Sequence, residues 1–113
     1  MHSILVVEDD EAIRAALFDA LTDEGYDADC FSDGNHALRH LEQRTVDLVL
    51  VDVYMPAMTG TDMVRRLRRK GDETPIIMMS AQPAQSLPHG VKFLRKPFDL
   101  DRLFQTIQDL LKP

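Results

Sequence analysis

Residues 4–10 read ILVVEDD, so four consecutive apolar residues run directly into three acidic ones. Similar apolar runs occupy 48–51 (LVLV) and 76–79 (IIMM), with a weaker run at 91–94 and an alternating, edge-like segment at 27–31. Short continuous apolar runs are typical of strands buried on both faces of a parallel sheet. Residues 4–10 therefore predict a buried strand that ends in a cluster of carboxylates.

Between these runs, apolar residues recur at steps of three and four, the spacing of one helix face. The stripes cover residues 13–21, 37–41, 63–67 and 103–111. Gly25 and Gly71 follow two of them, where a left-handed helix stop is expected. Alternating strands and helices imply right-handed crossovers. We expect an α/β fold: a flavodoxin-like five-stranded parallel sheet of order 2-1-3-4-5 with helices on both faces.

One connection is short for this fold. Between Ser80 and Lys92 lie only 11 residues, and two of them are prolines, Pro83 and Pro88. A crossover helix with its turns needs about 10–12 residues, and a proline disrupts a helix interior. We therefore expect the fourth helix to be shortened to a turn or missing.

Length, charge and cysteine content narrow the class of protein. The 113 residues suit one domain, and we expect 1–113 to form it. The net charge of −6 argues against binding to nucleic acid or to an anionic membrane. Cys30 is the only cysteine, which excludes an intrachain disulfide and a CxxC metal site. Neither a signal peptide nor a membrane span is apparent, so we expect a cytoplasmic protein.

The charge is unevenly distributed along the chain. Residues 1–64 hold 14 acidic and 3 basic residues, a net charge of −11, whereas residues 65–113 hold 5 acidic and 10 basic residues, a net charge of +5. Part of the positive charge is the run RRLRRK at 65–70. Favourable charge at a helix C-terminus explains this run, and a docking patch for an acidic partner is the alternative.

Carboxylates follow two strands that the expected sheet makes neighbours. Glu8 and Asp9 follow the first strand, and Asp52 ends the third. Clustered carboxylates repel one another unless a cation joins them, and oxygen ligands suit Mg²⁺. Capping of the next helix is the alternative for Glu8 and Asp9, and it is the expected role of Asp10 and Glu11.

Two further polar groups follow the fourth and fifth strands. Ser80 ends the fourth strand, and Lys96 and Pro97 follow the fifth. A hydroxyl and an ammonium group beside an acidic metal pocket suggest a phosphoryl site, since both offset or bind phosphoryl oxygens. Taken singly, Ser80 is an ordinary strand terminator and Lys96 a solvated charge. Pro97 allows a cis bond after Lys96.

Four motifs together resemble the receiver domain of two-component response regulators over essentially the whole chain. They are ILVVEDD at 4–10, LVDVYMP at 50–56 with Gly60 following, PIIMMSA at 75–81 and FLRKPF at 93–98. The resemblance implies that Asp52 accepts a phosphoryl group. It also implies that Asp9, Asp52 and the backbone carbonyl of Tyr54 bind Mg²⁺ directly, with Mn²⁺ as a substitute ion, and that Glu8 acts on the ion through water.

The resemblance assigns the remaining positions as well. Ser80 is similar to the switch hydroxyl that moves toward the phosphoryl group, Phe93 takes the aromatic switch position, and Lys96 is similar to the phosphate-contacting lysine. The implied donor is a phosphohistidine on a sensor histidine kinase or a histidine phosphotransfer protein. The domain would catalyse its own phosphorylation and dephosphorylation rather than act as an enzyme on a separate substrate. The sequence does not identify its downstream protein target.

Three other functions compete with a phosphorylatable receiver. A pseudo-receiver would keep the fold and bind a partner regardless of phosphorylation. A haloacid dehalogenase type of hydrolase also uses an aspartate nucleophile, but it wants a second aspartate where this chain has Tyr54. A flavodoxin would need a hydroxyl-rich phosphate loop after the first strand, which the chain lacks.

Overall fold

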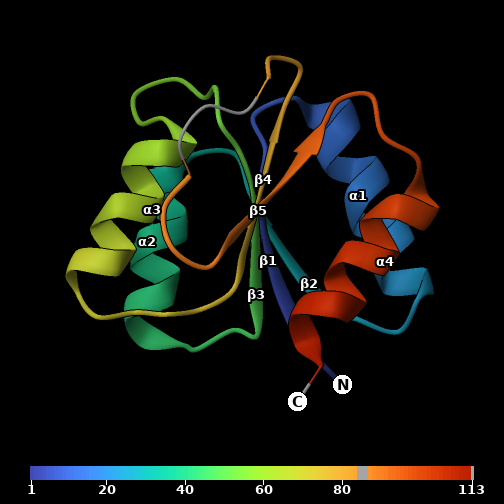
Figure 1. The fold of residues 1–113 in the computed structure, drawn as a ribbon, viewed down its shortest axis with the longest axis horizontal. Coiled ribbons are helices and arrows are strands. Elements are labelled where there is room, and N and C mark those ends of the chain that lie inside the picture. The colour runs from blue at the N-terminus through green and yellow to red at the C-terminus, as the bar shows by residue number, and fades with distance from the viewer. Residues whose placement is uncertain (84–86, 113) are drawn as a thin grey trace.

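The computed structural model describes residues 1–83 and 87–112. Its strands are β1 (Ser3–Val7), β2 (Asp27–Phe31), β3 (Leu48–Asp52), β4 (Ile76–Ser80) and β5 (Val91–Arg95). Its helices are α1 (Glu11–Asp23), α2 (Gly34–Gln43), α3 (Gly60–Arg69) and α4 (Leu100–Leu111). Strands and helices alternate as the apolar pattern predicts, except between β4 and β5 (Figure 1).

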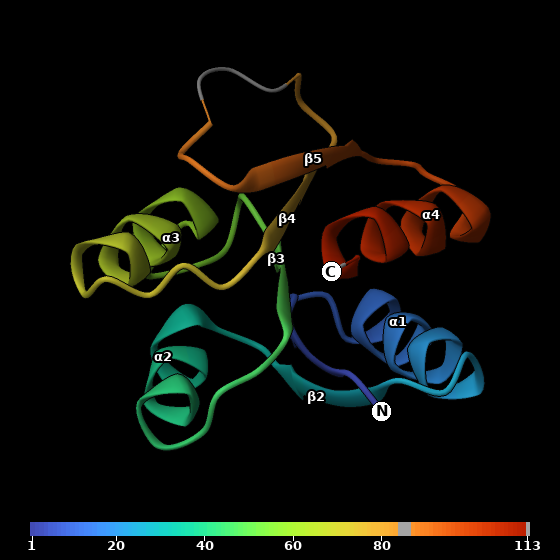
Figure 2. The same cartoon turned by 60° about the horizontal axis from the view of Figure 1, so that its bottom comes forward.

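All five strands are parallel and lie in the order β2-β1-β3-β4-β5. The predicted flavodoxin-like sheet is therefore confirmed, and the alternating segment 27–31 lies at an edge, as its pattern suggests. Helices α1 and α4 cover one face of the sheet, and α2 and α3 cover the other (Figure 2). The switch in strand order lies between β1 and β3, so their carboxyl ends border the crevice where ligands bind in such sheets.

Two cores hold these layers together, one on each face of the sheet. Successive strand residues alternate between them, because side chains in a strand point to opposite faces. Leu5, Val7 and Val51 pack toward α2 and α3, whereas Val6 and Leu50 pack toward α1 and α4. Burial on both faces is the reason that the central strands are continuously apolar rather than alternating.

The helix ends are fixed by local chemistry that the sequence carries. Each of the four helices has an N-cap side chain that accepts a hydrogen bond from a backbone amide three residues on: Asp10, Asp33, Thr59 and Asp99. Gly25 and Gly71 have φ values of +91° and +82°, the left-handed conformation predicted for them. Asp10 is thus a capping residue, as expected, and α1 starts directly beside the end of β1.

The connection from β4 to β5 contains no helix in residues 81–83 and 87–90, which agrees with the predicted loss of the fourth helix. Residues 84–86 lie outside the described residues. Arg68 of α3 anchors the far end of this connection by donating hydrogen bonds to the carbonyls of Asp72 (2.8 Å), Thr74 (3.0 Å) and His89 (3.0 Å). An arginine with several donors in one plane is suited to join carbonyls from two segments.

Candidate functional site

Three carboxylates converge where β1 and β3 end. The two strands are parallel partners in register at Val7 and Val51, so the residues that follow leave the sheet side by side. Glu8 and Asp52 are buried, with 1% and 8% of their surface exposed, while Asp9 is exposed. One carboxylate oxygen from each of the three lies within 4.8 Å of the other two. The structure thus brings together the acids that the sequence puts at these two strand ends.

Two residues fix the main chain beneath these carboxylates. Arg14 donates from Nη1 to the carbonyls of Glu8 (2.9 Å) and Asp9 (3.4 Å), a contact between α1 and the end of β1. A Cβ atom on Gly60 would lie 2.4 Å from the carbonyl oxygen of Asp52, so no larger residue fits there. The motif includes Gly60, but sequence reasoning missed Arg14. Its only signal is its place on the first turn of the helix that follows the acids.

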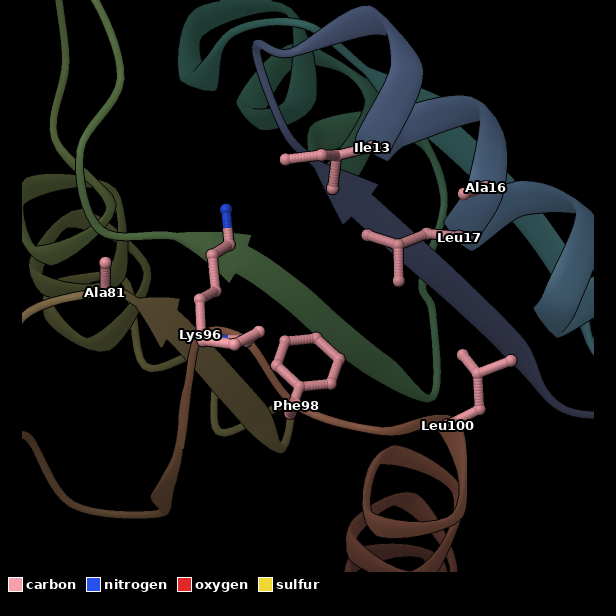
Figure 3. A pocket seen from close by; sticks show the side chains of 8 residues that line it. Ile13, Ala16, Leu17, Ala81, Lys96, Phe98 and Leu100 are labelled. Atoms are coloured by element: carbon pink, nitrogen blue, oxygen red, sulfur yellow. The ribbon is translucent and has the colours of Figure 1, made fainter.

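Lys96 reaches the carboxylates from the end of β5. Its Nζ donates to Glu8 Oε1 at 2.7 Å and to Asp52 Oδ2 at 3.0 Å. Its backbone amide donates to the Ser80 carbonyl at 2.8 Å, and the bond to Pro97 is cis. Figure 3 shows the amine extending toward the carboxyl end of β3. The lysine is therefore a partner of the buried acids and not a solvated surface charge.

The electrostatics of this cluster favour a further cation. Burial raises the pKa of Glu8 above its ordinary value, and the charge of Asp52 adds to the rise, although hydrogen bonds from Lys96 and from the Asp10 amide oppose it. Burial alone would lower the pKa of Lys96, but its hydrogen bonds to Glu8 and Asp52 outweigh burial and raise it. Lys96 is therefore charged at neutral pH, and one ammonium group faces three carboxyl groups.

The donor set fits a hard divalent cation. The three carboxylates form the only cluster of potential metal-binding acids, histidines or cysteines among the described residues, and it contains neither histidine nor cysteine. Such an oxygen-only set suits Mg²⁺ and disfavours zinc. Next to it, the Tyr54 amide donates to Asp52 Oδ1 at 3.2 Å, which keeps the backbone of Tyr54 close to the cluster.

Ser80 and Phe93 lie beside the carboxylate cluster rather than in it. Ser80 Oγ accepts a hydrogen bond from the Gln82 amide at 3.0 Å. Ser80, Phe93 and Tyr54 all line a hollow of about 440 Å³ on the α3 side of the sheet. Alternation along β4 explains this position, because Ser80 follows Met78 on the face opposite Met79. Among the described residues, Lys96 donates a hydrogen bond to Asp52, whereas the Ser80 hydroxyl is bonded to the Gln82 amide instead.

An apolar hollow of about 610 Å³ adjoins Lys96 on the other face (Figure 3). It is lined by residues of α1, by the residue after β4 and by the segment from the end of β5 to the start of α4: Ile13, Ala16, Leu17, Ala81, Lys96, Pro97, Phe98 and Leu100. Ile13 and Leu100 are 38% and 48% exposed. The hollow thus presents apolar side chains to solvent directly beside the carboxylate cluster.

Comparisons with known proteins agree with this geometry. Residues 4–108 match the family model of the response regulator receiver domain. The chain is 39% identical over 113 residues to the transcriptional regulatory protein TcrA of Mycobacterium tuberculosis, a match that covers 95% of this chain and 45% of TcrA. The chain therefore spans about half the length of that curated relative.

Solved structures resemble it over almost their whole length. The chemotaxis response regulator CheY4 of Vibrio cholerae superimposes with a TM-score of 0.89 at 30% identity, covering 98% of this chain and 99% of CheY4. The response regulator TrrA of Thermotoga maritima, solved in complex with Mg²⁺-BeF, gives a TM-score of 0.89 at 30% identity, covering 98% of this chain and 100% of TrrA.

Among the described residues, no helix has the length and apolar character needed to cross a membrane.

These matches exclude the hydrolase and flavodoxin interpretations. The order of the strands, the acids at the ends of β1 and β3 and the lysine after β5 occur together with a family match over nearly the whole chain. The chain belongs to the response regulator receiver domain family of two-component signalling.

Proposed function

We propose that Asp52 accepts a phosphoryl group from a phosphohistidine donor in a Mg²⁺-dependent reaction, and that this changes the binding of a downstream protein. Residues 1–113 would act as one domain. The observation that carries the proposal is the position of Asp52. It is a buried carboxylate within 4.8 Å of two other acids, and it is hydrogen-bonded to Lys96 at 3.0 Å.

The proposed chemistry is a displacement at phosphorus. A carboxylate oxygen of Asp52 attacks phosphorus and forms a P–O bond, the phosphorus–nitrogen bond to the donor imidazole breaks, and the released imidazole nitrogen takes a proton from solvent. Water later hydrolyses the acyl phosphate and regenerates Asp52. In such reactions the protein contributes mainly position and electrostatic stabilisation. The fixed backbone around Asp52, packed against Gly60, supports the role of a positioned nucleophile.

Charge neutralisation would be shared between a metal ion and Lys96. Asp9, Asp52 and the Tyr54 carbonyl would hold Mg²⁺, or Mn²⁺ in its place, with Glu8 acting through water. A bound ion offsets charge on the phosphoryl oxygens. Lys96 already spans Glu8 and Asp52, so a short movement of its amine would bring it to the new phosphoryl group. The related TrrA, solved with Mg²⁺-BeF, supports this assignment.

The response to phosphorylation would pass through Ser80 and Phe93. Ser80 would rotate from its contact with the Gln82 amide toward the phosphoryl group, and Phe93 would follow into the space released beside it. Binding of the phosphoryl group must favour one of two conformations for a signal to result. The hollow of about 440 Å³ that both residues line supports such a movement.

The donor would be a sensor histidine kinase or a histidine phosphotransfer protein that docks over the apolar hollow beside Lys96. Ile13 and Leu100 are exposed apolar side chains there, and contiguous exposed apolar surface marks protein interaction sites. A partner on this surface could bring a histidine to Asp52 without displacing the sheet or its helices.

The direct test is labelling with a small phosphodonor such as acetyl phosphate in the presence of Mg²⁺. The wild-type chain should form an acid-stable, base-labile acyl phosphate, while Asp52→Asn should not, because an amide cannot form that bond. Chelation of the metal should abolish labelling. Ser80→Ala is the matched variant in the hollow of about 440 Å³. This variant should still be labelled, but its Phe93 side chain should no longer move on phosphorylation.

Two results would contradict the proposal. Equal labelling of the wild type and Asp52→Asn would mean that another residue accepts the phosphoryl group. Absence of label on the folded wild type with both Mg²⁺ and a phosphohistidine donor would favour a pseudo-receiver that acts regardless of phosphorylation.

A further inference from the structure

Helices α2 and α3 lie side by side on one face of the sheet (Figure 2). A groove of about 380 Å³ is lined by residues of both helices. It is lined by Asn35, Leu38, Arg39 and Glu42 from α2 and by Arg66, Arg69 and Lys70 from the C-terminal end of α3. Except for Leu38, these side chains are exposed. The groove is therefore a solvent-facing surface with a narrow apolar floor and polar walls.

The walls carry a strong positive charge on an acidic protein. Four of the lining residues are cations and one is a carboxylate, whereas the whole chain has a net charge of −6. Lys70 pairs with Glu42 at 3.5 Å. Within residues 1–83 and 87–112, the side chains of Arg39, Arg66 and Arg69 form no ion pair and no hydrogen bond. Three guanidinium groups thus face the groove without a protein acceptor in the described part of the chain.

The structure divides the basic run 65–70 into parts with different roles. Arg68 turns inward to three backbone carbonyls, and Arg65 lies 3.9 Å from Asp62. Arg66 and Arg69 instead project toward α2. Favourable charge at the end of α3 would account for these two residues alone. It does not account for Arg39, which comes from the middle of another helix and faces the same groove.

We propose that the groove between α2 and α3 binds a short acidic segment of a partner protein. Carboxylates of such a segment would pair with Arg39, Arg66 and Arg69, since guanidinium groups bind carboxylates through paired hydrogen bonds. Nucleic acid fits less well, because a continuous phosphate backbone would extend from the groove over a chain whose residues 1–64 carry a net charge of −11. A short peptide confines its charge to the groove.

This surface is separate from the proposed phosphodonor surface. The apolar hollow beside Lys96 lies on the α1 and α4 side of the sheet, and the groove lies on the α2 and α3 side. Both can be occupied at once. The inference therefore goes beyond the phosphoacceptor function and does not depend on it.

The test is a titration of the whole isotope-labelled chain, without phosphodonor, followed by amide chemical shifts. The probe is a synthetic glutamate-rich peptide at low ionic strength, where surface charge is least screened. Shifts should centre on residues 35–42 and 66–70. A lysine-rich peptide of equal length should give no shifts at these residues, and a single-stranded oligonucleotide should bind more weakly than the acidic peptide.

Matched variants separate the groove from general charge. Arg66→Gln/Arg69→Gln should weaken peptide binding about tenfold. Lys92→Gln/Arg102→Gln removes the same charge from exposed residues of β5 and α4 and should leave the affinity within about twofold, because neither residue lines the groove and neither can pair with a peptide bound there. If the first variant does not fold, Arg39→Gln, which leaves the end of α3 intact, should show the weakening instead.

Three outcomes would overturn the inference. Equal loss of peptide affinity in the two double variants would mean that binding depends on the net charge of the chain and not on the groove. Shifts centred outside the groove would place the acidic segment elsewhere. Tighter binding of the oligonucleotide at the same residues would assign the groove to nucleic acid.

Discussion

The carboxylate pocket and the edge strand β5 are built differently. In the pocket, Glu8, Asp52 and Lys96 come from three strand ends, and every one of these side chains has a partner. On β5, Leu94 is 1% exposed under α4, while Phe93 on the opposite face is only partly buried. Strand order places the groups of the pocket at neighbouring strand ends, whereas covering a strand requires a connection long enough to contain a helix.

The largest expected effect on stability comes from removing the ammonium group of Lys96 from the carboxylate pocket. Lys96→Met should lower the free energy of unfolding by about 3 kcal/mol in metal-free buffer, because it leaves buried carboxylates without their counter-ion. The deficit should shrink as the pH falls toward the raised pKa of Glu8, since protonation removes the unpaired charge. Urea unfolding at several pH values measures both effects.

Lys92→Met is the matched control for this substitution. Lys92 is exposed on β5, so the same change of side chain should alter stability by less than about 0.5 kcal/mol. Equal losses from Lys92→Met and Lys96→Met would mean that the contacts of Lys96 with the two acids do not stabilise the fold.

A smaller effect sharpens the contrast on β5. Leu94→Ala should cost about 2.5 kcal/mol, because it leaves a cavity between the sheet and α4. Phe93→Ala should cost only about 1 kcal/mol despite its larger side chain, since Phe93 is only partly buried at the edge of the α3 side and residues 81–83 and 87–90 form no helix over it. Thermal unfolding of both variants tests this order, and a greater loss for Phe93→Ala would mean that the face is covered in solution.

The smallest effect has the opposite sign. Asp9→Asn should raise the free energy of unfolding by about 0.5–1 kcal/mol in metal-free buffer, because it removes one of three mutually repelling carboxylates. It should also weaken the stabilisation that Mg²⁺ gives the wild type, measured as the shift in Tm with added metal. Asp10→Asn keeps a capping side chain outside the cluster and should leave that shift unchanged. A full Mg²⁺ response in Asp9→Asn would exclude Asp9 as a ligand.

Much of the fold was predictable because its signals are local. Continuous apolar runs identify the strands, and Asp10 and Gly25 mark helix ends through capping and a positive φ. The missing helix before β5 was also predictable, since chain length and two prolines limit any helix there. The arrangement of Arg14 and the split of the basic run were not predictable, because helix rotation and packing decide which way each long side chain turns.

The sequence by itself determined which groups stand at the strand ends, and strand order then made Glu8, Asp9 and Asp52 neighbours. Only the tertiary structure decided that Lys96 bridges Glu8 and Asp52 while Ser80 lies in a separate hollow. It also decided that Arg39 faces Arg66 and Arg69 across one groove. The physical reason is that side-chain alternation, helix rotation and packing bring together residues that are far apart along the chain, and a linear pattern does not contain those distances.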